Sequence, residues 1–224
     1  MAVGLAAILA CGRGPRAERV APAGQEPAAS LRAAPLAVIL CVGTSLTAGY
    51  GLPDPDLAYP ALLQQRIDAA GLPYRVVNAG VSGETSAGAL RRMDWLLRQK
   101  VDVLVLETGA NDALRGQDPE ATRANVEAIL ARAEAESPPP RIVLLGMKAP
   151  PNLGPAYLER FDAIYPEEAR RHRAVLVPFL LDGVAGIPAL NQPDGIHPTA
   201  EGQRKMAELV WRALAPLVSP SPAR

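Results

Sequence analysis

The chain has 224 residues, of which 49% are hydrophobic, and its 23 Lys and Arg balance its 23 Asp and Glu. This length accommodates one domain with a sizeable core, and the absence of net charge offers no general field for a polyanion, so we expect no nucleic-acid partner. Two Cys and two His are too few for a disulfide framework or a His-rich metal site, and no apolar run reaches the roughly 20 residues that a membrane-spanning helix needs.

The first eleven residues contain a short apolar run that is followed by Cys11. The run 3–10 fits the ~7–15 residues of a signal-peptide hydrophobic region. The small residues before Cys11 resemble a bacterial lipoprotein cleavage site, although Leu9 fits its position loosely and no Lys or Arg precedes the run. We therefore expect the protein in the cell envelope, periplasmic or anchored to a membrane through lipidated Cys11, rather than in the cytoplasm. An ordinary N-terminal tail is the alternative.

Residues 12–34 have a different composition from the rest of the chain. They are rich in Ala, Pro, Gly and charged residues and contain almost no large apolar side chains. Such a segment cannot bury enough apolar surface to offset its ordering entropy. We expect a disordered tether over 12–34, a folded domain over 35–218 and a short tail over 219–224.

From Pro35 onward, apolar runs of strand length alternate with segments of helical periodicity. The expected strands are 36–42, 74–77, 101–106, 142–147 and 174–177. The expected helices are 59–70, 85–98, 119–135, 155–171 and 200–217. Gly71 after the first helix and Asp118 before Pro119 supply cap residues. Near-continuous hydrophobic strands separated by helices predict an α/β fold, a three-layer α/β/α sandwich with a five-stranded parallel sheet.

Ligands of such sheets bind beyond the carboxyl ends of the strands, and four polar, glycine-containing segments are expected at this edge. They are GTSLTAGYGL (43–52), NAGVSGETS (78–86), ETGAND (107–112) and DGIHP (194–198). Each supplies a different part of one kind of chemistry, which is why they are considered together.

The four segments contain the components of an acyl-transfer site. A serine nucleophile needs a base, and His197 is the better of the two His candidates to activate Ser45. Asp194 lies three residues before His197, so it can accept from one ring nitrogen and leave the other facing the serine. The N–H groups of Ser45 and Gly83 and the side-chain amide of Asn111 are candidate donors to an oxyanion. This chemistry needs neither a metal nor an organic cofactor.

Each of these residues also has a simpler structural interpretation. Ser45 can cap a turn, Gly83 can be a turn glycine, and Asn111 can close the third strand in an Asx turn. Asp194 and His197 can form the start of the last helix. The occurrence of all four segments at one edge of the sheet favours the catalytic interpretation.

Other sites are less consistent with the sequence. The G-x-S-x-G elbow is absent around Ser45 because position 47 is Thr, and neither common nucleotide-binding glycine motif follows the first strand. Cys41 lies inside an apolar strand, so we expect a buried small hydrophobe rather than a nucleophile. His172 is flanked by arginines at a helix end, and we expect it to be solvated.

Four blocks of the sequence resemble, in order and spacing, those of the GDSL or SGNH hydrolase superfamily. They are GTSLTAGYGLP, NAGVSGETSAGALRRM, ETGANDALRG and DGIHPTAEGQRKMAE. The resemblance extends over about residues 36–216 and is greatest for the branch of arylesterases and acyl-CoA thioesterase I/lysophospholipase enzymes. It implies a flavodoxin-like fold with strand order 2-1-3-4-5. It also implies a hydrolase whose named residues fall on Ser45, Gly83, Asn111 and His197, with Asp194 completing the triad.

Two positions depart from the pattern of this superfamily. Members usually carry Asp immediately before the nucleophile, whereas this chain has Thr44, and Ala110 stands where many members have Gly. A threonine hydroxyl supplies one acceptor but no charge. Because Thr44 lies outside the predicted triad and oxyanion hole, we expect a perturbed loop in an active enzyme.

The function implied by the residues and the resemblance is that of a serine esterase. Its substrate is expected to be a small-molecule or lipid ester: an aryl or short-to-medium acyl ester, a thioester or a lysophospholipid. Leu153, Tyr157 and Phe161, spaced by fours, could form an apolar wall for the acyl chain or simply face the core. A carbohydrate O-acetyl esterase using the same site, and a non-catalytic binding module of the same fold, are the alternatives.

Overall fold

The computed structural model describes Met1 and residues 36–219. The predictions made for Cys11, for the tether 12–34 and for the tail beyond Ser219 concern residues outside these, and they stay predictions. No helix in the described part of the chain is both long and apolar enough to cross a bilayer.

Five parallel strands form one sheet in the order β2-β1-β3-β4-β5, which confirms the predicted strand order. The strands are β1 (Ala37–Gly43), β2 (Tyr74–Gly80), β3 (Val103–Glu107), β4 (Arg141–Leu145) and β5 (Val175–Val177). The chain moves from β1 to β2 on one side and later to β3 on the other. Since ligand sites form where the strand order reverses, the carboxyl ends of β1 and β3 are the expected location of the site.

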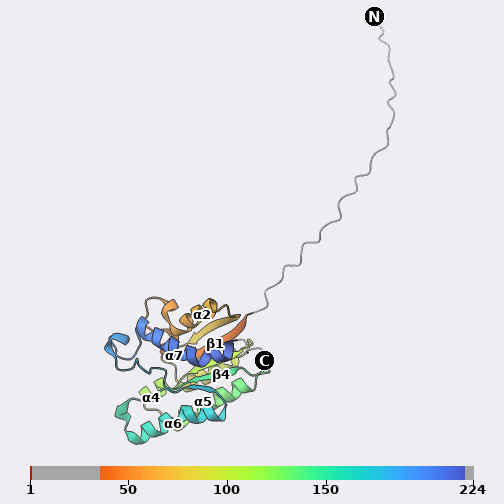
Figure 1. Ribbon diagram of the computed structural model, residues 1–224. Coiled ribbons are helices and arrows are strands. Elements are labelled where there is room, and N and C mark those ends of the chain that lie inside the picture. The colour runs from red at the N-terminus through yellow and green to blue at the C-terminus, as the bar shows by residue number, and fades with distance from the viewer. Residues whose placement is uncertain (2–35, 220–224) are drawn as a thin grey trace. The chain divides into compact units, whose positions relative to one another are not determined.

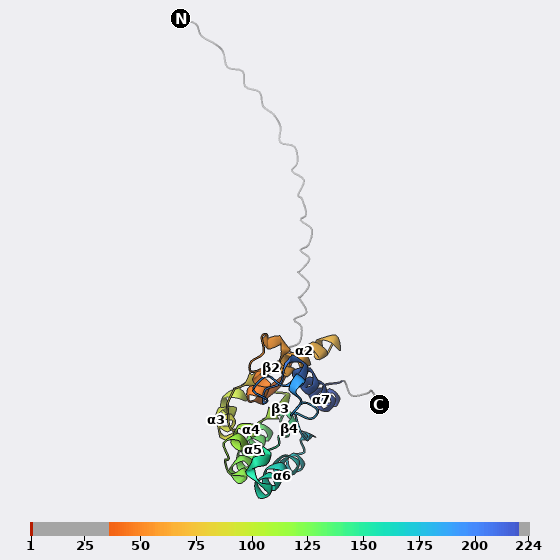
Figure 2. The same cartoon turned by 90° about the vertical axis from the view of Figure 1, so that its left-hand side faces the viewer.

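Helices cover both faces of the sheet (Figures 1 and 2). On one face α2 (Tyr59–Ala69) packs against α7 (Ala200–Val218). On the other, α5 (Pro119–Glu134) packs between α3 (Ser86–Leu96) and α6 (Pro155–Arg171). All five helices predicted from the sequence are present, and the three-layer arrangement is confirmed.

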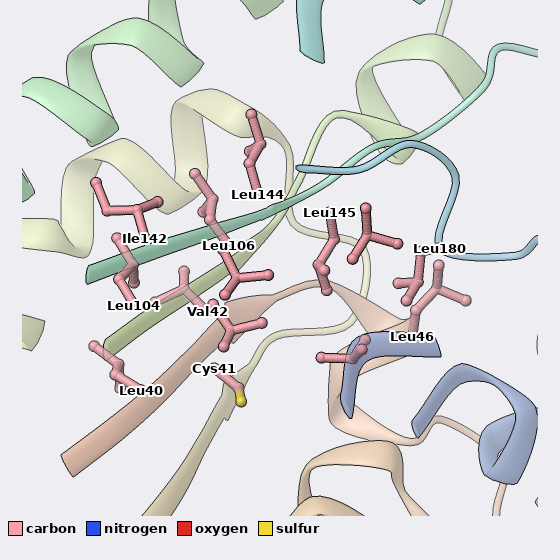
Figure 3. Close-up of a cluster of buried hydrophobic side chains, with 14 of the residues drawn as sticks. Leu40, Cys41, Val42, Leu46, Leu104, Leu106, Ile142, Leu144, Leu145 and Leu180 are labelled. Atoms are coloured by element: carbon pink, nitrogen blue, oxygen red, sulfur yellow. The ribbon is translucent and has the colours of Figure 1, made fainter. Parts of the chain in front are cut away.

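The core is built from rows of side chains that cross the central strands. The parallel register aligns residues of β1, β3 and β4, and side chains at alternate positions share a face. Figure 3 shows two such rows, Leu40–Leu104–Ile142 and Val42–Leu106–Leu144. All six side chains are buried on one face of the sheet. The residues at the intervening positions, Ile39, Cys41, Val103, Val105 and Val143, are also buried, so both faces of these strands need the helices that cover them.

Local sequence signals account for the helix ends. Gly71 follows α2 with a φ of +63°, and the Leu72 N–H closes the helix by donating to the Ile67 carbonyl. Asp118 caps α5 by accepting from the Glu120 N–H, with Pro119 at the first helical position. The sequence did not predict two short helices, α1 (Ser45–Ala48) and α4 (Ala110–Leu114), which begin just beyond β1 and β3.

The second strand is longer than expected. It continues beyond Val77 to Gly80, and Asn78 to Gly80 pair with Cys41 to Gly43 of β1. Polar and small residues concealed this extension, because β2 is an edge strand whose side chains are only partly buried. The extension brings the loop that contains Gly83 beside the start of α1.

Candidate active site

Ser45 lies at the start of the single-turn helix α1, directly beyond β1. The turn is closed by the Ala48 N–H, which donates to the Thr44 carbonyl, and it ends at Gly49 in the left-handed region with a φ of +75°. A residue with a side chain would be strained at that position. The serine hydroxyl is thereby presented at the edge of the sheet where the strand order reverses.

His197 and Asp194 approach Ser45 from the segment before α7. The His197 Nε2 atom lies 2.9 Å from the Ser45 Oγ atom, and its Nδ1 atom lies 2.7 Å from the Asp194 Oδ2 atom. A carboxylate can only accept, so Nδ1 carries the proton and Nε2 accepts from the serine hydroxyl. The three residues named from the sequence are therefore brought together in the order that nucleophile activation requires.

The Asp194 carboxylate is held by its own loop. Its Oδ1 atom accepts hydrogen bonds from the N–H groups of Ile196 and His197 at 2.9 and 3.0 Å. These backbone bonds and the His197 side chain lower the pKa of Asp194 to about 2. The group is therefore ionised near neutral pH and can stabilise an imidazolium.

Polar side chains attach this loop to its surroundings. Gln192 donates through Nε2 to the carbonyls of Tyr50 and Pro198 at 2.7 and 3.1 Å, and its N–H donates to the His197 carbonyl at 2.7 Å. The Tyr50 ring packs against the imidazole of His197, with ring centroids 4.6 Å apart and ring planes tilted by 45°. Neither Gln192 nor Tyr50 was named from the sequence, because their roles depend on contacts between segments distant in the chain.

The predicted oxyanion donors lie around the same cavity as Ser45. Gly83 adopts a φ of +78°, and the Asn111 Nδ2 atom donates to the Glu84 carbonyl at 3.0 Å, which leaves its second amide hydrogen free for a ligand. Within residues 36–219, no hydrogen bond is donated by the N–H of Ser45 or of Gly83. An amide and two unused N–H groups are thus available beside the serine.

Two arginines hold the Gly83 loop in place. The Arg115 guanidinium donates to the Gly83 carbonyl at 2.9 Å. Arg92 forms a bidentate ion pair with Glu84, in which the closest approach is 2.7 Å. Such paired hydrogen bonds fix geometry as well as charge.

The most consequential residue that sequence reasoning missed is Glu107, at the end of β3. Its buried carboxylate accepts from the N–H and the hydroxyl of Thr44 and from the hydroxyl of Thr47. The expectation for Thr44 was therefore wrong in its detail, because its hydroxyl acts as a donor and the Glu107 carboxyl is the acceptor. Thr44 is ordered by this contact, so the loop is anchored despite the departure from the superfamily pattern.

The wall of the cavity is not the one proposed from the sequence. The cavity has a volume of about 820 Å³ and includes Met147, Ala149, Pro150, Phe179 and Leu181 among its lining residues. Within the described chain, its lining includes none of the three helix residues suggested as an acyl-chain wall: Leu153, Tyr157 and Phe161.

The helical residues suggested for that wall instead pack towards the core. Phe161 is fully buried, and it stacks on Tyr157 with ring centroids 6.1 Å apart. The Tyr157 hydroxyl donates to the Gln117 carbonyl at 2.7 Å. The alternative of a core-facing helix is therefore the correct one.

Two residues outside the site were also assessed from the sequence. Cys41 is fully buried, and burial raises the pKa of its thiol to about 12, so the expectation of a small hydrophobe is confirmed. The expectation for His172 was wrong: its side chain is only 7% exposed, and its Nδ1 atom lies 3.0 Å from the Glu134 Oε2 atom. The packing of α6 against α5 covers it, which the flanking arginines did not indicate.

The described residues contain no group of three or more His, Cys, Asp or Glu side chains arranged to hold a metal ion. The functional groups gathered around Ser45 are instead a base, a carboxylate and hydrogen-bond donors.

Comparison with known proteins gives concordant results. A model of the GDSL-like Lipase/Acylhydrolase family matches residues 41–205. Esterase TesA of Pseudomonas aeruginosa is 43% identical over 181 residues, which cover 80% of this chain and 89% of that protein. Thioesterase 1/protease 1/lysophospholipase L1 of Escherichia coli K12 is 38% identical over 191 residues, 85% of this chain and 89% of that protein.

The chain is also similar to an arylesterase and to an esterase of known structure. The arylesterase of Vibrio mimicus is 34% identical over 177 residues, which cover 79% of this chain and 87% of that protein. The crystal structure of AlinE4, an SGNH-hydrolase family esterase, superposes with a TM-score of 0.67 at 41% identity and covers 83% of this chain and 98% of that one. The sheet and its covering helices are those of the SGNH hydrolase fold.

Proposed function

Because the chain belongs to the GDSL-like lipase/acylhydrolase family, we propose that Ser45 is the nucleophile of a two-step ester hydrolysis. The chain is a carboxylic ester hydrolase of the esterase TesA and arylesterase type. The observation that carries the residue assignment is the line of contacts from Ser45 Oγ through the His197 ring to Asp194, at 2.9 and 2.7 Å.

In the first step Ser45 attacks the carbonyl carbon of the ester. The Oγ–C bond forms as His197 Nε2 takes the hydroxyl proton, and the carbonyl π electrons move to the oxygen. Asp194 holds the Nδ1 proton and stabilises the imidazolium that results. Its lowered pKa keeps it ionised while this positive charge develops.

The developing oxyanion is bound by the N–H groups of Ser45 and Gly83 and by the amide of Asn111. Charge develops on this oxygen in the transition state, so donors already oriented toward it lower the barrier without reorganising. Within residues 36–219 the N–H groups of Ser45 and Gly83 donate to no other group, which supports this role. The Arg115 contact to the Gly83 carbonyl supports it further, because it fixes the direction of the loop.

The intermediate collapses when His197 returns its proton to the leaving oxygen or sulfur and the bond to the acyl carbon breaks. Water then takes the place of the leaving group, gives a proton to His197 and attacks the acyl-serine. The same oxyanion donors serve the second step, which releases the carboxylic acid and restores the Ser45 hydroxyl. Every proton transfer uses the one imidazole.

The cavity favours substrates with an apolar acyl or aryl group. The part of its wall formed by Met147, Ala149, Pro150, Phe179 and Leu181 carries no charged, hydroxyl or amide side chain that could bind sugar hydroxyls. We propose aryl and short-to-medium acyl esters as substrates. Thioesters and lysophospholipids are further proposals, supported by the name of the Escherichia coli relative. The test compares kcat/KM for a chain-length series of nitrophenyl esters with kcat/KM for acetylated sugars. A higher kcat/KM for the acetylated sugars would contradict this substrate proposal.

The test of the mechanism is covalent labelling of the full chain with a fluorophosphonate. We expect one adduct by intact mass, mapped to Ser45, absent in Ser45→Ala and formed far more slowly in His197→Ala. Ser82→Ala is the matched control, because Ser82 lines the same cavity and has no proposed role. Failure of the folded wild-type protein to form an adduct would favour the non-catalytic binding module.

A further inference from the structure

Glu107 is a buried ionisable group that the proposed chemical steps do not use. It ends β3, which pairs with β1, and its side chain is inaccessible to solvent. Its Oε2 atom lies 2.7 Å from the Thr44 N–H nitrogen and 2.9 Å from the Thr47 Oγ1 atom, and its Oε1 atom lies 2.9 Å from the Thr44 Oγ1 atom. The two threonines lie on either side of Ser45, one immediately before it and the other two residues after it.

The segment that Glu107 contacts cannot hold its own conformation. The helix α1 has four residues, and a single turn fixes several dihedral angles for very few hydrogen bonds. Thr44 occupies the position before this helix, but its side chain makes no capping hydrogen bond. Its hydroxyl and its N–H are both directed to Glu107. The anchor of the turn is therefore a residue of another strand.

The fit around this carboxylate is tight and specific. A Cβ atom at Gly43 would lie 2.6 Å from the Glu107 Oε2 atom and 1.9 Å from the Thr47 Oγ1 atom, so only glycine permits the approach. The Thr47 hydroxyl also contacts the Tyr59 hydroxyl at 3.0 Å, which links the cluster to α2. Thr44 and Thr47 are themselves buried, so water does not compete for these contacts.

The hydrogen-bond partners of Glu107 in the described chain are neutral groups. Its pKa is raised, because burial penalises the charged form more than the hydrogen bonds from Thr44 and Thr47 favour it. A buried carboxyl with neutral partners is costly for a protein to keep. This unfavourable free energy of burial suggests that the Glu107 carboxyl has a function besides filling the core.

We propose that Glu107 is a positioning residue for ester hydrolysis, which acts by holding Thr44 and Thr47 and thereby fixing the Ser45 hydroxyl and N–H. The inference rests on the proposed role of Ser45. It explains how the chain keeps an ordered nucleophile turn with threonine at position 44. Displacement of such a turn by about 1 Å is enough to reduce the rate about 100-fold.

The test compares Glu107→Ala and Glu107→Gln with the wild-type full chain. Hydrolysis of a short nitrophenyl ester gives kcat and KM, and fluorophosphonate gives the rate of serine labelling. We expect Glu107→Ala to lower kcat and the labelling rate about 100-fold with KM changed less than about threefold, because the acyl pocket is untouched. Glu107→Gln keeps an acceptor oxygen for the Thr44 N–H, so its kcat and labelling rate should be about tenfold higher than those of Glu107→Ala.

Glu168→Ala is the matched control, because Glu168 is also a fully buried carboxyl but lies on α6 and contacts Arg123 and His172. It should lower the melting temperature and leave kcat unchanged. An equal fall in kcat for both alanine variants, or a Glu107→Ala enzyme within threefold of wild type, would overturn the proposal.

Two outcomes separate this inference from the function on which it rests. Wild-type protein that neither hydrolyses esters nor labels at Ser45 contradicts the proposed function, whereas active wild type with unaffected Glu107 variants contradicts only the positioning role. If Glu107→Ala fails to fold, Thr44→Val decides the matter. It removes one hydroxyl donor and keeps the N–H, and it should lower kcat several-fold at unchanged KM. If folded Thr44→Val has the kcat of wild type, the proposal that Glu107 positions Ser45 is refuted.

Discussion

Two segments approach each other at the site: the nucleophile turn (44–48) and the base segment (194–197). They are held in opposite ways. The nucleophile turn is buried, with Thr44 2% exposed and Thr47 fully covered, and its anchor Glu107 lies 63 positions from Thr44 and 60 from Thr47 in the chain. In the segment that supplies the base, the Asp194 side chain is 40% exposed and the His197 side chain 18%. One half of the site therefore depends on tertiary burial and the other on short-range hydrogen bonds.

The Asp194 carboxylate in the base segment accepts hydrogen bonds from groups within three positions of it in the chain. Asp194 accepts from the backbone of Ile196 and His197 as well as from the imidazole, and Gly195 turns the chain with a φ of +71°. Because these bonds are local and partly solvated, changing one should alter the chemistry with little effect on folding. In the nucleophile turn, removal of one hydrogen bond should affect both the rate of hydrolysis and the stability of the fold.

The sharpest test of this difference is Asp194→Asn. An amide at this position can present a donor to Nδ1, which favours the wrong imidazole tautomer, so we expect kcat to fall by about 10³–10⁴-fold. The melting temperature should stay close to that of wild type, since the residue lies at the surface. Steady-state kinetics and thermal unfolding on the same preparation measure both. A large loss of stability would show that the base segment is not independent of the fold.

Asn111→Ala should have the next largest effect. Removing one oxyanion donor costs about 10²–10³-fold in kcat, and this side chain also ties α4 to the Glu84 carbonyl. We expect KM to change little, because the donor acts mainly in the transition state. The control is Asn125→Ala: Asn125 donates to the hydroxyl of Ser86, three residues after Gly83, and its loss should leave kcat within a few-fold of wild type. Equal effects would mean that loop disorder, rather than a lost donor, explains the result.

Thr47→Val tests the buried half by its stability. The substitution removes one donor to the Glu107 carboxyl and the hydrogen-bond partner that the Tyr59 hydroxyl has among the described residues. A buried group left unsatisfied costs about 1–3 kcal/mol. Urea denaturation should show this loss in the free energy of unfolding.

Thr108→Val is the matched control for this test. Thr108 is equally buried, but its hydroxyl has no hydrogen-bond partner in the described structure, so valine there should be neutral or stabilising. Equal destabilisation by both variants would remove the argument that the hydrogen bonds of Thr47 matter.

The same contrast explains what could be predicted from the sequence. Asp194 and His197 form a local pattern, and their spacing alone indicated a hydrogen bond. The strands and long helices were also predictable, because their periodicity and caps are local. Glu107 was not, since a carboxylate at a strand end has no sequence signal that names its partners across the sheet. The residues of the cavity wall could not be identified for the same reason: Phe179 and Leu181 reach it from a segment without regular structure.

The smallest expected effect is the pH dependence of stability that Asp194 contributes. Its pKa in the folded protein is lowered to about 2 by hydrogen bonds from His197 and Ile196, against about 3.9 for an unperturbed Asp. A depressed pKa means that the stabilisation is complete above about pH 4 and is lost as the pH falls through about 2. The difference in melting temperature between wild type and Asp194→Asn should therefore be constant from pH 7 to 5 and shrink toward pH 2. A difference that grows on acidification would mean that burial, rather than the local hydrogen bonds, governs this carboxylate, and the contrast between the two halves of the site would fail.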